Sequence, residues 1–172
     1  MFETFNYRRY GEIIVFLLSL YLLSNKYNLL VCYTIGTCFN IIINTILKGL
    51  IQQPRPNDNP ELLNLALQNG KRHIYKNGIP YSIYGMPSGH SQYILYSTIF
   101  VYLSLKNPKI LLLYLLIAFI INGLNVWYSY HTVFQVIVGG IVGVIIGYIF
   151  YYIAQHNLKG ILKAKPDDFG PI

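Results

Sequence analysis

Five stretches of the chain contain no Asp, Glu, Lys, Arg or His, and shorter polar segments separate them. These stretches are residues 13–25, 27–47, 91–105, 110–130 and 132–155. A bilayer core of about 30 Å needs roughly 20 helical residues, so the second, fourth and fifth stretches are long enough to cross it alone. The first and third must borrow flanking residues or lie partly in the interface. The pattern predicts an all-α fold, a polytopic membrane helical bundle with about five transmembrane helices.

One long polar segment, residues 52–86, lies between the second apolar stretch and the third. It contains several Asn and Gly and the prolines Pro54, Pro56, Pro60 and Pro80, which interrupt regular helices. Within it, residues 60–68 begin with proline and an acid and carry four leucines, which predicts a short interfacial helix. We therefore expect residues 52–86 to form an extramembrane loop.

The order of the stretches also predicts which connections meet. Consecutive membrane helices run in opposite directions, because each crossing takes the chain to the other side of the bilayer. The end of the second stretch, the start of the third and the start of the fifth should therefore lie at one membrane face. All the polar residues considered below as site candidates belong to this face.

Four glycines recur three or four residues apart in the last stretch. They are Gly139, Gly140, Gly143 and Gly147. Small residues at this spacing let the backbones of two membrane helices approach closely. We expect this helix to pack tightly against a neighbour, and we assign the glycines no other role.

The composition agrees with a membrane location. Hydrophobic residues make up 54% of the chain and charged residues 11%, against roughly 25% charged residues in soluble domains. The formal charge of +7 is spread between the apolar stretches, and no Lys/Arg cluster is interleaved with exposed aromatic residues, which argues against a nucleic-acid partner. The length predicts a single domain over residues 1–172.

Two further features carry no functional signal. Residues 1–10 are polar and no small-residue cleavage site follows the first apolar stretch, so no cleavable signal peptide is expected. Cys32 and Cys38 lie within one apolar stretch, where they are expected to be buried as small hydrophobic residues rather than to form a disulfide or a zinc site.

Two cations, two histidines and a predicted helix start converge on the shared face. Lys48 and Arg55 follow the second stretch, residues 87–90 (Pro-Ser-Gly-His) enter the third, and His131 enters the fifth. We expect Ser88 to be the helix N-cap, so that the N–H groups of the next three residues lack helical partners. Such a terminus attracts anions, and the two cations would neutralise phosphate oxygens. Each feature alone has a simpler structural explanation, but their joint occurrence predicts a phosphate site.

At these residues the chain resembles the type 2 phosphatidic acid phosphatase superfamily of membrane lipid phosphatases. The family's first motif, Lys-x6-Arg-Pro, is matched by Lys48 and Arg55-Pro56, and its second, Pro-Ser-Gly-His, by residues 87–90. Of its third motif, Ser-Arg-x5-His-x3-Asp, the chain keeps His131. The other three positions of this motif hold Leu124, Asn125 and Gln135.

The residues around the two histidines are similar to the dolichyldiphosphatase branch of this superfamily. That branch has a Gly-Met-Pro-Ser-x-His-Ser-Gln segment, as at residues 85–92, and a Tyr-His-Thr-x-x-Gln segment, as at residues 130–135. The resemblance covers roughly residues 48–143 and implies a membrane phosphatase-like domain with its motifs in that core. Both the superfamily and the branch usually place a phosphate-binding arginine where this chain has Asn125.

The resemblance implies a two-step phosphoryl transfer that needs no metal and no other cofactor. His131 would attack the terminal phosphorus, His90 would protonate the departing lipid phosphate, and water would then cleave the phosphohistidine. Gln135 would accept the ring N–H of His131 and orient it, since it lies four positions after His131 and thus on the same helix face. Asn125 would make a weak phosphate contact. The phosphate oxygens would be held by Lys48, Arg55, Ser88 and Gly89.

A site at the headgroup level of a bilayer suits a phosphate on a long apolar tail, so the expected substrate is a polyisoprenyl diphosphate of the dolichyl type. Family analogy places the protein in the endoplasmic reticulum, with the site facing the lumen. The alternatives are a general lipid phosphate phosphatase of the phosphatidic acid type, which Gln135 argues against, and a pseudo-enzyme that binds lipid phosphates. A channel is disfavoured because the polar groups gather at one face instead of lining a path.

Overall fold

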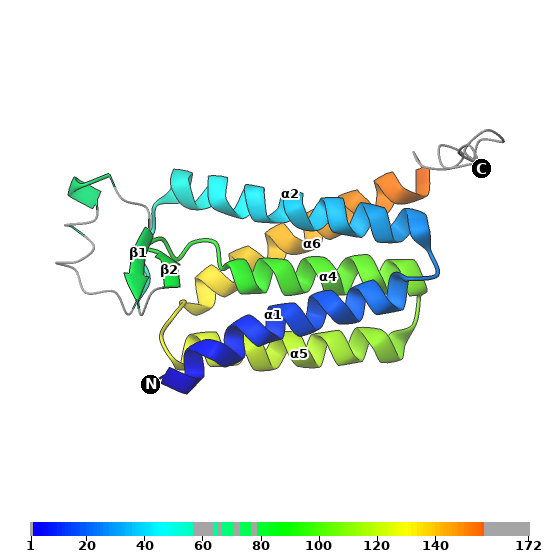
Figure 1. Ribbon diagram of the computed structural model, residues 1–172, viewed down its shortest axis with the longest axis horizontal. Coiled ribbons are helices and arrows are strands. Elements are labelled where there is room, and N and C mark those ends of the chain that lie inside the picture. The colour runs from blue at the N-terminus through cyan, green and yellow to red at the C-terminus, as the bar shows by residue number, and fades with distance from the viewer. Residues whose placement is uncertain (1, 57–63, 65–66, 71–72, 77–78, 157–172) are drawn as a thin grey trace, which may run out of the picture.

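The computed structural model describes residues 2–56, 64, 67–70, 73–76 and 79–156. Within these residues, five long helices run side by side, each antiparallel to the next along the chain (Figure 1). They are α1 (Phe2–Leu23), α2 (Tyr27–Ile51), α4 (Gly89–Leu105), α5 (Pro108–Trp127) and α6 (Val133–His156). The helical bundle and its alternating directions confirm what the apolar stretches predict.

Three of these helices, α2, α5 and α6, are long and apolar enough to cross a membrane. They correspond to the second, fourth and fifth apolar stretches, the same three that the length of the stretches selects. Helix α1 starts well before its apolar part, which covers Tyr10–Leu23, and α4 has 17 residues. A bundle that crosses the membrane five times remains a prediction for these two helices.

Helix α4 is the centre of the bundle and contacts each of the other four helices. Ten of its 17 residues are buried, and several of them are polar. Tyr33 of α2 packs its ring on Tyr96 and Phe100 of α4, with ring centroids 5.5 Å apart in each pair. Its hydroxyl lies 2.9 Å from the hydroxyl of Ser97. Hydrogen bonds between helices thus satisfy polar groups inside an otherwise apolar core.

The glycines of α6 allow its closest contact, which is with α4. A Cβ atom added at Gly139 would meet the carbonyl oxygen of Ser88, and one added at Gly143 would meet the carbonyl oxygen of Gln92. The predicted tight packing of this helix is therefore confirmed, because the glycines leave room for backbone rather than for side chains. The contact at Ser88 brings the start of α4 against the first turns of α6.

The long loop contains a hairpin that the all-α prediction missed. Strand β1 (His73–Lys76) pairs antiparallel with β2 (Ile79–Ser82), and Ile74 lies opposite Tyr81. The sequence does contain a pattern that predicts this hairpin. Asn-Gly at residues 77–78, between β-branched and aromatic residues, is typical of a two-residue hairpin turn. The predicted helix over residues 60–68 falls largely outside the described residues.

Candidate active site

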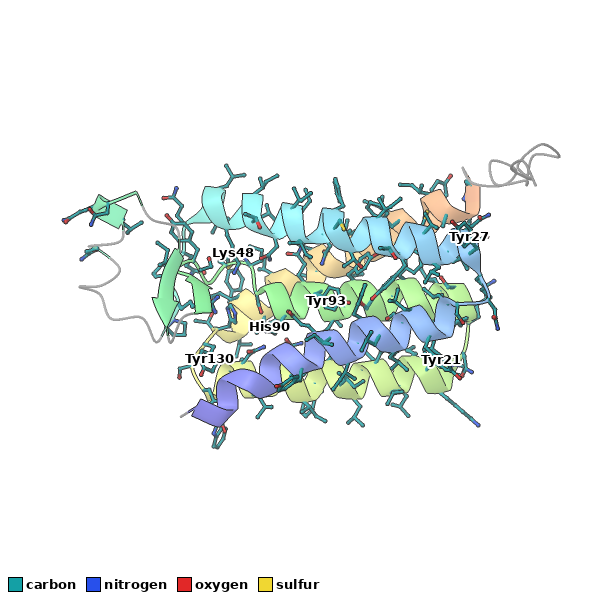
Figure 2. The ribbon with its side chains drawn as sticks, viewed as in Figure 1. Tyr21, Tyr27, Lys48, His90, Tyr93 and Tyr130 are labelled. Carbon is teal, nitrogen blue, oxygen red and sulfur yellow. The ribbon has the colours of Figure 1, made fainter. Side chains whose placement is uncertain are left out.

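The predicted site residues gather at one end of the bundle. Figure 2 shows Lys48 at the end of α2, His90 at the start of α4 and Tyr130 in the connection between α5 and α6, all at the end that carries the hairpin. Tyr21 and Tyr27 lie at the opposite end. The residues that the alternation of the helices predicts to share one end of the bundle therefore do so.

His131 is almost completely buried, with 1% of its surface exposed. Its Nε2 lies 2.9 Å from Nη1 of Arg55, and its Nδ1 lies 3.2 Å from Oε1 of Gln135. A guanidinium group can only donate hydrogen bonds, so Nε2 must be the acceptor and Nδ1 must carry the ring proton. The contacts thus fix one neutral tautomer, with the lone pair of Nε2 turned toward a cation.

The end of α5 places His131 at this point. Helix α5 ends at Trp127, three residues before the end of the predicted stretch, because Ser129 adopts a left-handed conformation with φ of 54°. The N–H groups of Tyr130 and His131 then donate to the carbonyl oxygen of Asn125, at 2.9 and 3.2 Å. These bonds turn the chain and hold His131 immediately before the next helix.

A reciprocal pair of capping bonds starts α6. The hydroxyl of Thr132 accepts the N–H of Gln135 at 3.2 Å, and Oε1 of Gln135 accepts the N–H of Thr132 at 3.3 Å. This Thr-x-x-Gln arrangement is a capping box, which satisfies two backbone donors at a helix start. The residue that accepts from the His131 ring is therefore fixed by the helix terminus itself.

Gln135 also ties the long loop to the site. Its Nε2 donates to Oε1 of Gln53 at 3.1 Å and to the carbonyl oxygen of Pro54 at 2.9 Å. Gly85 leaves the space for this amide, since a Cβ atom there would lie 2.6 Å from Oε1 of Gln135. A carboxylate could accept from His131 but could not donate to Pro54. These contacts give a physical reason for glutamine at this position in this chain.

Arg55 is held by backbone oxygens on two sides and has 8% of its surface exposed. Its Nε donates to the carbonyl oxygen of Ser82 at 3.0 Å, and its Nη1 donates to the carbonyl oxygen of Tyr130 at 3.2 Å. A guanidinium held in this way presents planar N–H donors beside the His131 ring, which is the geometry that suits phosphate oxygens.

Ser88 is the N-cap of α4, as predicted, and its hydroxyl accepts the N–H of Ser91 at 3.5 Å. This bond corrects one detail, because the N–H of Ser91 is no longer available to an anion. The backbone N–H of Ser88 donates to the carbonyl oxygen of Gln135 at 3.0 Å, so the start of α4 is joined directly to α6. Lys48 contacts the residues that lead into α4, since its Nζ donates to the carbonyl oxygen of Tyr84 at 3.3 Å.

His90 stands on the other side of this helix start, against α1. Its Nε2 lies 3.7 Å from Oε1 of Glu12, and 23% of its side chain is exposed. The sequence did not single out Glu12, although an acid immediately before an apolar stretch was a usable signal, since ionisable residues at membrane depth are seldom without a role.

Asn125 has a fully buried side chain with no hydrogen-bond partner for either its oxygen or its nitrogen among the described residues. Leaving buried polar atoms unsatisfied costs about 1–3 kcal/mol each. Such an amide has two N–H donors and an acceptor oxygen that the described residues leave unused. In the part of the chain that the structure describes, no group of three or more His, Cys, Asp or Glu residues could hold a metal ion.

Comparison with known proteins places the site in a family context. A sequence model of the PAP2 superfamily matches residues 29–159, more than half of the chain. Human dolichyldiphosphatase 1 is 33% identical over 122 residues, which cover 62% of this chain and 44% of that protein. The dolichyldiphosphatase of Saccharomyces cerevisiae is 28% identical over 138 residues, 74% of this chain and 52% of that protein. The chain spans about half the length of the curated relatives it matches. No solved structure matches it.

Proposed function

The chain belongs to the PAP2 superfamily, and from this premise we propose that it is a membrane phosphatase that hydrolyses a polyisoprenyl diphosphate to the monophosphate. The observation that carries the proposal is the state of His131. Its ring is buried, its proton is on Nδ1 beside Gln135, and its Nε2 lone pair lies 2.9 Å from the Arg55 guanidinium. The Nε2 lone pair is what would attack phosphorus, and the Arg55 guanidinium would stabilise the negative charge of the phosphate oxygens.

In the first step, Nε2 of His131 attacks the terminal phosphorus of the diphosphate. The bond between this phosphorus and the bridging oxygen breaks, and the lipid monophosphate leaves with a proton from His90. Nδ1–H of His131 stays hydrogen-bonded to Gln135, which keeps the ring oriented as its charge grows. Nη1 of Arg55, which donates to Nε2, turns its donor to a phosphate oxygen once phosphorus takes the lone pair.

In the second step, water attacks the phosphohistidine and gives its proton to His90. The bond between nitrogen and phosphorus breaks, inorganic phosphate leaves, and His131 recovers its lone pair. The three equatorial oxygens carry the charge in both steps. We assign them to the cations Lys48 and Arg55, the hydroxyl of Ser88 and the N–H of Gly89. No step of this scheme requires a metal ion or another cofactor.

We assign a further phosphate contact to Asn125, because its buried amide has no partner within the described residues. An amide N–H can donate to a phosphate oxygen, but it lacks the charge and the paired donors of the arginine usual at this position of the family. We therefore expect a functional site with slower turnover than one that carries arginine there.

The proposed substrate follows from the position of the site and from the relatives. A phosphate on an isoprenoid chain reaches the end of a helical bundle by lateral diffusion, with its tail in the bilayer, and both relatives described above are named for dolichyl diphosphate. We propose that the site faces the lumen of the endoplasmic reticulum, as the family resemblance implies, and that the five helices all cross the membrane.

The test is phosphate release from polyprenyl diphosphates by the purified chain in detergent, compared with two histidine variants. His131→Ala should abolish release. His156→Ala should leave it unchanged, because His156 lies at the far end of the same helix and is exposed. Equal release from the two variants would overturn the mechanism. Release from phosphatidic acid alone would make the chain a general lipid phosphate phosphatase, and binding without release would make it a pseudo-enzyme.

A further inference from the structure

Glu12 is one of the six Asp and Glu residues of the chain. Glu12 stands near the middle of α1, at the start of its apolar part. With α1 crossing the membrane, as proposed above, Glu12 lies at the start of the span, and an ionisable residue there is a candidate for function.

The packing of α1 turns Glu12 toward the start of α4. Gly11, the residue before it, is buried, and a Cβ atom there would meet the side chain of Ile121 on α5. This contact seats one side of α1 against α5 and leaves Glu12 on the side that faces α2 and α4. There its Oε1 lies 3.7 Å from Nε2 of His90. Figure 2 shows His90 on the first turn of α4, beside α1.

Glu12 also lies at the edge of a groove. Glu12 and Gly89 line a groove of about 530 Å³ between α1, α2 and α4. Among the described residues that line it, the polar ones other than Glu12, such as Asn40 and Asn44, are uncharged. The side chains of His90 and Glu12 are 23% and 36% exposed, so the pair is partly shielded from water, which screens charges most strongly.

The two histidines of the site therefore meet opposite environments. His131 has a cation at Nε2 and an amide oxygen at Nδ1, which favours a neutral ring. His90 has a carboxylate at Nε2, which favours a protonated ring. Two titratable groups whose surroundings push them toward different protonation states are the usual sign of an acid and a base assigned to separate tasks.

We propose that Glu12 is a positioning residue that keeps His90 protonated, so that His90 enters the first step as the acid. This inference rests on the proposed phosphatase function. Because Nε2 is the ring nitrogen near Glu12, we assign the proton transferred to the departing lipid phosphate to Nδ1. In the second step, Nδ1 takes a proton from the attacking water, and the pair returns to its starting state.

The first test is turnover of a polyprenyl diphosphate by Glu12→Gln, which removes the charge and keeps the shape. We expect kcat to fall roughly tenfold or more, within the range of acid catalysis, while KM stays within about twofold. Glu12→Asp, which restores the charge, should recover most of the lost turnover. Thr45→Val is the matched control, since Thr45 lines the same groove but its hydroxyl bonds to its own helix. Turnover of Glu12→Gln equal to that of Thr45→Val would overturn the proposal.

The second test needs no substrate. The ¹⁵N resonances of the His90 imidazole, assigned by comparison with His90→Asn, report whether both ring nitrogens carry protons. At about pH 7, we expect a doubly protonated ring in the wild type and a neutral ring in Glu12→Gln. The same ring state in both proteins would contradict the role of Glu12. If the wild-type chain released no phosphate, the proposed function would fail, while these spectra would still decide whether Glu12 controls His90.

Discussion

The amide of Gln135 offers the sharpest test of how the site is held together. Gln135→Glu keeps the size of the side chain and one oxygen to accept from His131, but it removes both bonds that Nε2 donates, to Gln53 and to Pro54. Two acceptors next to a buried side chain then lose their donor. Both acceptors belong to exposed residues that water can reach, so the loss is the net contribution of two hydrogen bonds, and folding should be weaker by roughly 1–3 kcal/mol.

This loss corresponds to a fall of roughly 2–12 °C in the unfolding midpoint for a chain of this size. Thermal unfolding in detergent measures it. Gln92→Glu provides a comparison, because the Gln92 amide also donates two bonds, at 2.9 Å, to the carbonyl and side-chain oxygens of Asn40, but away from the His131 ring. Both variants should unfold at a lower temperature than the wild type. A Gln135→Glu protein as stable as the wild type would refute the view that this amide ties the loop to α6.

Three further predictions follow from the same contacts. Arg55→Lys keeps the charge but not the donors of Nε and Nη1, so kcat/KM for a polyprenyl diphosphate should fall by roughly 30- to 150-fold, about 2–3 kcal/mol; unchanged kcat/KM would contradict the guanidinium geometry. Gly143→Val should lower the unfolding midpoint, because α6 packs on the backbone of α4 there, while Gly123→Ala, whose Cβ would meet nothing within 4 Å, should not. Asn125→Leu should raise that midpoint, since it removes an unpartnered buried amide, yet slow hydrolysis; an active and more stable variant would argue against a phosphate contact at this residue.

The sequence predicted those parts of the structure that depend on local pattern. Long apolar stretches must form helices in a bilayer, and their alternation is enough to bring Lys48, residues 87–90 and His131 to one end. Ser88 was identifiable as an N-cap because serine before a new apolar helix has few other uses. The glycines of α6 likewise indicated close packing before any partner helix was known.

Other parts depend on contacts between distant segments, which no local pattern reveals. The bonds from Gln135 to Gln53 and Pro54 join residues more than 80 positions apart. The pair between Glu12 and His90 depends on how α1 is turned by its contact with α5. Helix α5 ends early because Ser129 adopts a left-handed conformation. No glycine or proline, the usual sequence signals for a helix end, is present at that point. In each case tertiary structure decides the role of a residue that looks ordinary in the sequence.

The most direct test of the account is to trap the covalent intermediate. The purified chain is incubated with a polyprenyl diphosphate that carries ³²P in its terminal phosphate, quenched rapidly in alkali, in which phosphohistidine survives, and analysed by peptide mapping. The account predicts label on the peptide that contains His131, and none in His131→Ala. Phosphate release by the wild-type chain without label on His131, or release that persists in His131→Ala, would contradict the central claim.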